Sequence, residues 1–227
     1  MPKANIILSQ DGSHTIHSEQ FNVSYHSKYG AIQETQTVFL DAGLKHVLEL
    51  TESKTVSILE MGFGTGLNAL MTLLSKYAEG ITIDYQTIEA YPISLSDAAE
   101  LNYPSVLNVS GKEKQSFLDM HAAANSKKVQ LTDIFSFTKY ITLLEDFTSD
   151  EKFDIIYYDA FAPTSQEHLW TDEMMKKIAS ITAENGVLVT YCAKGSFKRA
   201  LKSAGFTVEG IPGPIGKREM TRATLLI

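Results

Sequence analysis

Short apolar runs alternate with segments of helical periodicity along most of this chain. Four of the runs are rich in β-branched residues and are typical of strands buried on both faces, namely 56–61, 81–89, 153–159 and 187–192. Each run is followed by a segment whose apolar residues recur three and four positions apart, as in an amphipathic helix. This alternation predicts a mostly parallel sheet with helices on both of its faces.

The remaining signals are less regular. A helix at 114–124, a short strand at 129–131 and an aromatic strand at 135–141 are expected before the third long run. Two last strands, 206–209 and 221–227, lie close enough in sequence to pair antiparallel. We therefore expect an α/β, Rossmann-like, doubly wound sheet of seven strands, with an antiparallel last strand and a ligand at its switch point.

The start of the chain has a different pattern. Short alternating segments at 4–8 and 15–18 are typical of strands. The stretch 29–50 has the spacing of one or two amphipathic helices, with a possible break at Asp41-Ala42-Gly43. We expect residues 1–50 to form an N-terminal extension that packs on the sheet and over its ligand.

The first long run ends in a glycine-rich turn, Glu60-Met61-Gly62-Phe63-Gly64-Thr65-Gly66-Leu67-Asn68, which leads into a predicted helix at 67–77. Glycines at alternate positions allow a sharp turn and let the backbone approach a ligand where a Cβ would collide. Leu67 holds the position at which a dinucleotide site needs a small residue, and no lysine follows as in a P-loop. The remaining pattern is that of S-adenosylmethionine sites, where a carboxylate such as Glu60 suits a cationic ligand. A purely structural left-handed turn is the alternative.

Two acids stand where predicted strands end at the ligand-binding edge of the sheet. Glu89 lies 23 residues after Gly66, where a carboxylate accepts the ribose hydroxyls of a bound adenosine; a solvated strand end is the alternative. Asp159 and the backbone carbonyls of 160–163 suit an amine nucleophile, which must be oriented and must lose a proton. A structural strand cap is the alternative for Asp159. Three acids remain open as partners of the adenine amino group: Asp133, Glu145 and Asp146.

Composition and charge limit the number of domains and the kinds of partner that the protein can bind. The 227 residues are 44% apolar, which suffices for the core of one α/β domain, expected at 51–227. The net charge of −7 argues against a protein that binds nucleic acid over its whole surface. The part from Lys194 onward nevertheless carries +5 and the rest −12. This distribution is compatible with a local phosphate contact, although a solvated helix face explains 194–202 equally well.

Other signals bear on the compartment and on metals. The chain has no apolar run near the roughly 18 residues of a membrane span, and its start lacks the build of a signal peptide, so we expect a cytoplasmic protein. The single cysteine, Cys192, has no partner for an internal disulfide, and no Cys/His cluster has zinc spacing. We expect no metal, and we expect surface or packing positions for His14, His17 and His26.

Several motifs together resemble one known family. The turn at 60–68, Ile88-Glu89-Ala90-Tyr91-Pro92, Tyr158-Asp159-Ala160-Phe161-Ala162-Pro163 and Gly216-Lys217-Arg218-Glu219-Met220 closely resemble the methyltransferase domain of the MnmC family. These are bifunctional bacterial enzymes of 5-methylaminomethyl-2-thiouridine synthesis in tRNA. The segment 29–40 also resembles that domain, so the resemblance spans nearly the whole chain.

The resemblance implies a class I methyltransferase that moves a methyl group from S-adenosylmethionine to 5-aminomethyl(-2-thio)uridine at the tRNA wobble position. By position, the cofactor would be held by Glu60, Gly62, Phe63, Gly64, Thr65, Gly66, Asn68 and Glu89. Asp159, Phe161 and Pro163 would face the substrate amine. Glu34, Lys217 and Arg218 would bind the substrate at the anticodon arm of the tRNA.

The sequence also departs from that family. We find no FAD-dependent oxidase domain after the methyltransferase motifs and therefore expect a separate enzyme to supply the aminomethyl intermediate. Two other functions remain open: methylation of a small-molecule or protein amine, and a non-catalytic cofactor-binding scaffold.

Overall fold

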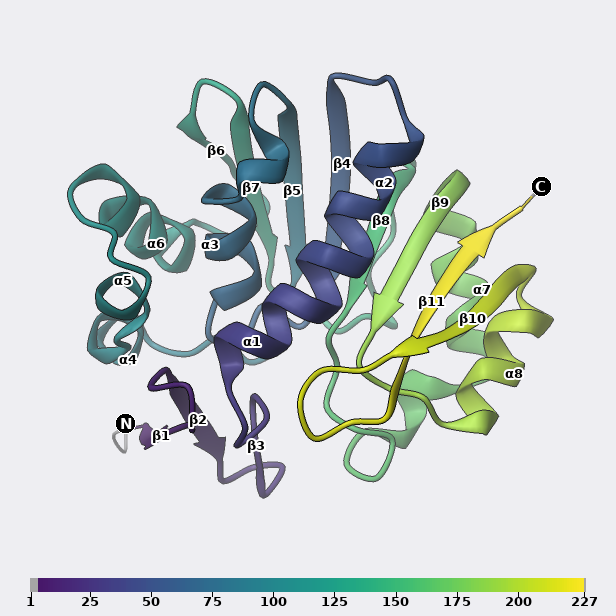
Figure 1. Cartoon of the computed structure of the whole chain (residues 1–227), viewed down its shortest axis with the longest axis horizontal. Coiled ribbons are helices and arrows are strands. Elements are labelled where there is room, and N and C mark those ends of the chain that lie inside the picture. The colour runs from purple at the N-terminus through teal and green to yellow at the C-terminus, as the bar shows by residue number, and fades with distance from the viewer. Residues whose placement is uncertain (1–3, 227) are drawn as a thin grey trace.

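A central sheet dominates the computed structural model, which describes residues 4–226. Within this range the sheet has eight strands in the order β10-β11-β9-β8-β4-β5-β7-β6 (Figure 1). Its five inner strands run parallel: β4 (Thr55–Met61), β5 (Thr82–Ile88), β7 (Phe135–Tyr140), β8 (Phe153–Tyr158) and β9 (Thr182–Thr190). The predicted class, a mostly parallel doubly wound sheet, is confirmed.

Both edges of the sheet are antiparallel. On one edge β11 (Glu219–Leu225) pairs with β9 and with β10 (Phe206–Pro212), as the predicted closing hairpin requires. Ile227, the predicted end of that hairpin, lies outside the described residues. On the other edge β6 (Lys128–Thr132) pairs with β7. The predicted number of seven strands was wrong. The short strand expected at 129–131 is β6, and its connection of two residues to β7 is short enough for a hairpin, so β6 joins the same sheet as an eighth strand.

Successive residues of the inner strands point into two separate cores. Ile58 and Leu59 of β4 belong to opposite clusters, and so do Ile155 and Ile156 of β8. This alternation is the side-chain period of a strand whose two faces are both covered. One core is covered by α3 (Leu67–Leu73), α5 (Tyr103–Val106) and α6 (Lys112–Ala122), and the other by α7 (Asp172–Ile181) and α8 (Gly195–Ser203).

Local capping explains several helix boundaries. Ser94 caps α4 (Leu95–Glu100), since its Oγ accepts from the N–H of Asp97 at 3.0 Å. Thr171 caps α7 in the same way through the N–H of Met174. The helix predicted at 67–77 ends at Leu73. The described residues also include two short 3-10 helices, η2 (Lys76–Ala78) and η3 (Glu167–Trp170).

Residues 4–50 form two parts. The strands β1 (Asn5–Leu8), β2 (His14–Ser18) and β3 (Val23–Ser24) make a small antiparallel sheet of their own. After it, α1 (Ala31–Thr35), the π-helical η1 (Gln36–Lys45) and α2 (His46–Leu50) follow one another as one long helix across a face of the central sheet (Figure 1).

The helix break predicted at Asp41-Ala42-Gly43 was wrong. Gly43 lies inside η1 and faces the sheet, where a Cβ would come within 2.9 Å of Val189 Cγ2 and 3.2 Å of Tyr157 Cε1. The glycine therefore allows the helix to approach the sheet closely instead of ending it.

Candidate active site

A cavity lies at the carboxyl ends of β4, β5 and β8. On one side of β4 lies the next strand of the chain, β5, and on the other side lies β8, which comes much later in the sequence. Such a switch point is where open α/β sheets bind ligands. The predicted residues that line this cavity are Gly62, Phe63, Gly64, Thr65, Asn68, Glu89, Asp159 and Phe161.

The turn after β4 requires its glycines. Gly62, Gly64 and Gly66 have φ angles of 92°, 51° and 77°, in the left-handed region. A Cβ at Gly62 would lie 2.7 Å from the carbonyl oxygen of Asp159, and one at Gly64 would lie 2.7 Å from Tyr25 Cδ1. Gly66 precedes α3 and is not among the cavity-lining residues.

Glu89 is fixed by the main chain. Its Oε2 accepts the N–H of Gly64 and its Oε1 accepts the N–H of Tyr91, both at 2.8 Å. Burial raises the pKa of Glu89 above its ordinary value, and the two backbone N–H groups and the charge of Lys139 oppose that rise. The carboxylate therefore stands at the cavity wall with its position set by backbone donors.

Asn68 joins two other acids. Its Nδ2 donates to Glu60 Oε1 at 3.0 Å and to Asp159 Oδ2 at 2.8 Å, while its Oδ1 accepts from Thr35 Oγ1 at 2.8 Å. Glu60 is fully buried and lies behind Asn68, away from the cavity wall. Burial, and then the charge of Asp159, raise the pKa of Glu60 well above its ordinary value.

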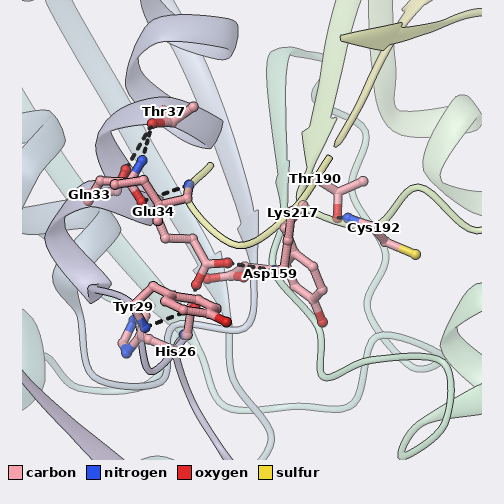
Figure 2. A network of polar contacts seen from close by, with 12 residues as sticks. His26, Tyr29, Gln33, Glu34, Thr37, Asp159, Thr190, Cys192 and Lys217 are labelled. Carbon is pink, nitrogen blue, oxygen red and sulfur yellow. Dashed lines mark hydrogen bonds and ion pairs between the residues drawn. The ribbon is translucent and has the colours of Figure 1, made fainter. Parts of the chain in front are cut away.

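Asp159 titrates close to neutral pH. Burial and then the charge of Glu34 raise the pKa of Asp159 to about 7, against the hydrogen bond from Asn68 and the charge of Lys217. Figure 2 shows Asp159 beside Glu34 and Lys217, which arrive from α1 and from the turn between β10 and β11. A carboxyl group with such a pKa exchanges protons readily near pH 7.

The chain after Asp159 is held by side chains. Tyr191 Oη donates to the carbonyl of Ala160 at 2.9 Å, and Trp170 Nε1 donates to that of Phe161 at 2.9 Å. Two of the carbonyls predicted to face an amine therefore already accept hydrogen bonds from the protein. Pro163 is not among the cavity-lining residues.

The N-terminal extension supplies part of the cavity wall that sequence reasoning missed. Phe21 and Tyr25 line the cavity, and the centroid of each ring lies 5.0 Å from that of Phe161. His26 also lines it, and burial lowers the pKa of His26 to about 4, so its ring is neutral at pH 7. Isolated aromatic residues in a short irregular segment carry no periodic signal that would have identified them.

The three residues predicted to bind substrate are not among the cavity-lining residues. Lys217 and Glu34 form an ion pair with an N–O distance of 2.6 Å. Arg218 is exposed, and within residues 4–226 it forms no ion pair.

One of the three acids left open for adenine lies at the cavity. Glu145 lines it together with Leu143 and Leu144, whereas Asp133 and Asp146 do not. The Oε1 atom of Glu145 lies 3.4 Å from Nε2 of His168, another lining residue.

Neither a membrane helix nor a metal cluster is found in the described part of the chain. None of the helices there has both the length and the apolar content of a bilayer-spanning helix. The same residues bring no three His, Cys, Asp or Glu side chains together in the manner of metal ligands.

Known proteins resemble this chain over most of its length. It is 29% identical to the tRNA 5-methylaminomethyl-2-thiouridine biosynthesis bifunctional protein MnmC of Marinomonas sp. over 90% of this chain and 32% of that protein. The MnmC protein of Pseudoalteromonas atlantica is 30% identical over 96% of this chain and 33% of that protein. The chain thus spans about a third of the length of these relatives. These matches confirm the resemblance to MnmC that the motifs indicated.

Two further comparisons concern a solved structure and a family model. The structure of MNMC2 from Aquifex aeolicus has the same fold, with a TM-score of 0.78 and 22% identity over 99% of this chain and 71% of that one. A family model described as S-adenosyl-L-methionine-dependent methyltransferase matches residues 96–226. The chain belongs to this family, the S-adenosyl-L-methionine-dependent methyltransferases.

Proposed function

We propose that this protein methylates the exocyclic amine of 5-aminomethyl(-2-thio)uridine at the wobble position of tRNA, giving the 5-methylaminomethyl nucleoside. The observation that carries the proposal is Asp159, a partly buried acid at the edge of the cavity with a pKa of about 7. Support also comes from the relatives, whose names refer to 5-methylaminomethyl-2-thiouridine biosynthesis in tRNA.

The residues at one end of the cavity fit the cofactor. The backbone of 62–65 has no room for a Cβ at Gly62 or Gly64, which is the character of a turn that a nucleotide approaches closely. Glu89 would accept the ribose hydroxyls, and Glu145 is our choice among the three acids for the adenine. When bound, S-adenosylmethionine supplies an electrophilic methyl group on a sulfonium.

The other end suits an amine. A primary alkylamine is largely protonated at pH 7, and its nitrogen has no lone pair until one proton leaves. We assign that proton to the Oδ atoms of Asp159, which Asn68 holds in a fixed orientation at 2.8 Å. After the proton has moved, the carboxyl group passes it to solvent, and Phe161 and Phe21 shield the nitrogen from water on the apolar side.

The test is transfer of radiolabelled methyl from S-adenosylmethionine to tRNA from cells blocked before the methyl step. Fully modified tRNA is the control, and the digested product should migrate as the methylaminomethyl nucleoside. Asp159→Asn should lower kcat by about 10²- to 10⁴-fold, as expected for a lost general base, with cofactor affinity nearly unchanged. No label in either tRNA pool, with cofactor still bound, would point to a small-molecule or protein amine or to a scaffold.

A further inference from the structure

Lys217 lies between two internal partners. Its Nζ is 2.6 Å from Glu34 Oε1 (Figure 2). The same atom lies 3.7 Å from the centroid of the Tyr191 ring. Glu34 is buried, and its second oxygen, Oε2, accepts the N–H of Ser27 at 3.0 Å. An ammonium with a carboxylate on one side and an aromatic face on the other is held inside the protein.

The backbone of the turn fixes where Lys217 stands. The N–H of Ile215 donates to Gln33 Oε1 at 3.2 Å, which ties the turn to α1. Gly216 has a φ of 86° and packs so closely on Tyr29 that a Cβ would overlap the ring. The turn between β10 and β11 therefore delivers Lys217 to the start of α1.

Asp159 is the acid that this pair affects. The charge of Glu34 raises its pKa and the charge of Lys217 lowers it. Tyr191 connects the two places, because its ring contacts Lys217 while its Oη donates to the carbonyl of Ala160, next to Asp159.

Other titratable groups also lie around Asp159, and burial shifts the pKa of each of them toward its neutral form. Burial raises the pKa of Glu60 on β4, of Tyr85 on β5 and of Tyr191 after β9, each well above its ordinary value. Burial lowers that of His26, after β3, to about 4. Glu34 and Lys217 are the side chains whose charges act on the pKa of Asp159.

We propose that Lys217 is a positioning residue whose charge favours the ionised form of Asp159, and that Glu34 holds the ammonium of Lys217 in place. The proposal rests on the proposed function, in which Asp159 takes the proton of the substrate amine. Without Lys217, the carboxyl groups of Glu34 and Asp159 would lie beside each other with no ammonium next to them (Figure 2), and neighbouring like charges disfavour ionisation. Lys217 then acts inside the protein and not on a phosphate of the tRNA.

The first test is the pH profile of kcat/KM. Lys217→Met should move the acid limb about one pH unit higher, because the charge of Lys217 lowers the pKa of Asp159 and a neighbouring opposite charge typically shifts a carboxyl by about one unit or more. With a midpoint near 7 in the parent, activity should be about fivefold lower at pH 7 and within about twofold at pH 9. Lys217→Arg keeps the charge and should keep the parent profile.

The second test needs no tRNA. The side-chain carboxyl of Asp159 is titrated by ¹³C NMR and assigned by its loss in Asp159→Asn. Its midpoint should rise in Lys217→Met and fall in Glu34→Gln, since the two substitutions remove opposite charges. Lys217→Met leaves the buried Glu34 without its ion-pair partner, whereas Glu34→Gln removes that acid. The titration of Glu34→Gln therefore still decides the question if Lys217→Met does not fold.

The outcomes separate the two proposals. If the parent protein methylates no tRNA pool, the proposed function fails, while the titration still decides the role of Lys217. An unchanged midpoint in both variants would overturn that role. So would a loss of activity in Lys217→Met that is equal at all pH values and accompanied by a weaker salt dependence of tRNA binding, since that result would place Lys217 on the RNA.

Discussion

The cavity has two ends, and the acids that mark them, Glu89 and Asp159, are held in different ways. Glu89 receives one backbone N–H on each oxygen, from Gly64 and Tyr91. Asp159 is held by a side-chain amide, that of Asn68, and lies among the charges of other side chains. One end is built from main chain and the other from side chains.

This difference separates binding from chemistry. Backbone donors keep their positions when the charge of the ligand changes, which suits recognition of a cofactor common to a whole family. Side-chain charges can set the pKa of a single acid, which suits an end of the cavity where a proton must move. Substitutions at the main-chain end should therefore change cofactor affinity, and substitutions at the side-chain end should change the dependence on pH.

The largest effect is expected at the main-chain end. Gly62→Ala places a Cβ 2.7 Å from the carbonyl oxygen of Asp159, where backbone would have to move on both sides. We expect a loss of cofactor affinity of at least about 100-fold and destabilisation by roughly 3 kcal/mol from overlap and backbone strain. Isothermal titration with S-adenosylmethionine and urea unfolding measure the two quantities.

A matched control is available at Gly80. It also has a positive φ, 74°, but a Cβ there would have no atom within 4 Å. Gly80→Ala should cost only the strain of the conformation, about 1 kcal/mol, and leave cofactor affinity unchanged. If Gly62→Ala and Gly80→Ala had the same cofactor affinity and the same unfolding free energy, the close backbone contact at Gly62 would not be needed for cofactor binding.

A smaller effect, dependent on pH, is expected at the side-chain end. The pKa of Asp159 is about 7 in the folded protein, against an ordinary value of 3.8. A group with a raised pKa contributes its full stability below the unfolded value and loses it as pH rises through the folded one. Relative to Asp159→Asn, the parent should therefore lose about 2 to 4 kcal/mol of unfolding free energy between about pH 4 and 7 and then level off.

Urea unfolding of both proteins from pH 4 to 8 measures this loss. Asp150→Asn, at an exposed position, serves as the control for the substitution itself. A flat difference for Asp159→Asn would mean that Asp159 is ionised throughout, like an ordinary surface acid.

The smallest effect concerns two neighbouring cations. Lys217 points inward to Glu34, whereas Arg218 is exposed. Arg218→Ala should weaken tRNA binding about threefold at low salt and reduce the slope of log Kd against log salt by about one, as for one lost phosphate contact. Fluorescence anisotropy at several salt concentrations measures the slope, which Lys217→Met should leave unchanged. Equal slopes in the parent and Arg218→Ala would remove Arg218 from the RNA interface.

The main-chain end could be predicted from sequence because its determinants are local. Nine consecutive residues, 60–68, specify the strand end, the glycine turn and the helix start, and the second strand brings Glu89 to the same edge. The parallel core of the sheet was predicted on the same grounds, since apolar runs and helical periods are also local patterns.

The side-chain end could not be assembled in this way. Glu34, Asn68, Asp159 and Lys217 come from four distant segments, and spacing in sequence says nothing about how they meet. The motifs indicated the residues one by one but gave no sign that Lys217 pairs with Glu34 or that Glu60 lies behind Asn68. The unbroken helix at Gly43 was likewise decided by tertiary packing.

The sequence separation of Glu34 and Lys217, 183 residues, also bears on how the protein folds. The turn at 60–68 and Glu89 are all present once the first 90 or so residues have been synthesised, but Lys217 is added near the end of the described chain. Contacts this distant in sequence raise the contact order and close late, because the loop entropy must be overcome first. We therefore expect a nascent chain to form the main-chain end of the cavity before its side-chain end. The ion pair between Glu34 and Lys217 would then form among the last contacts of folding.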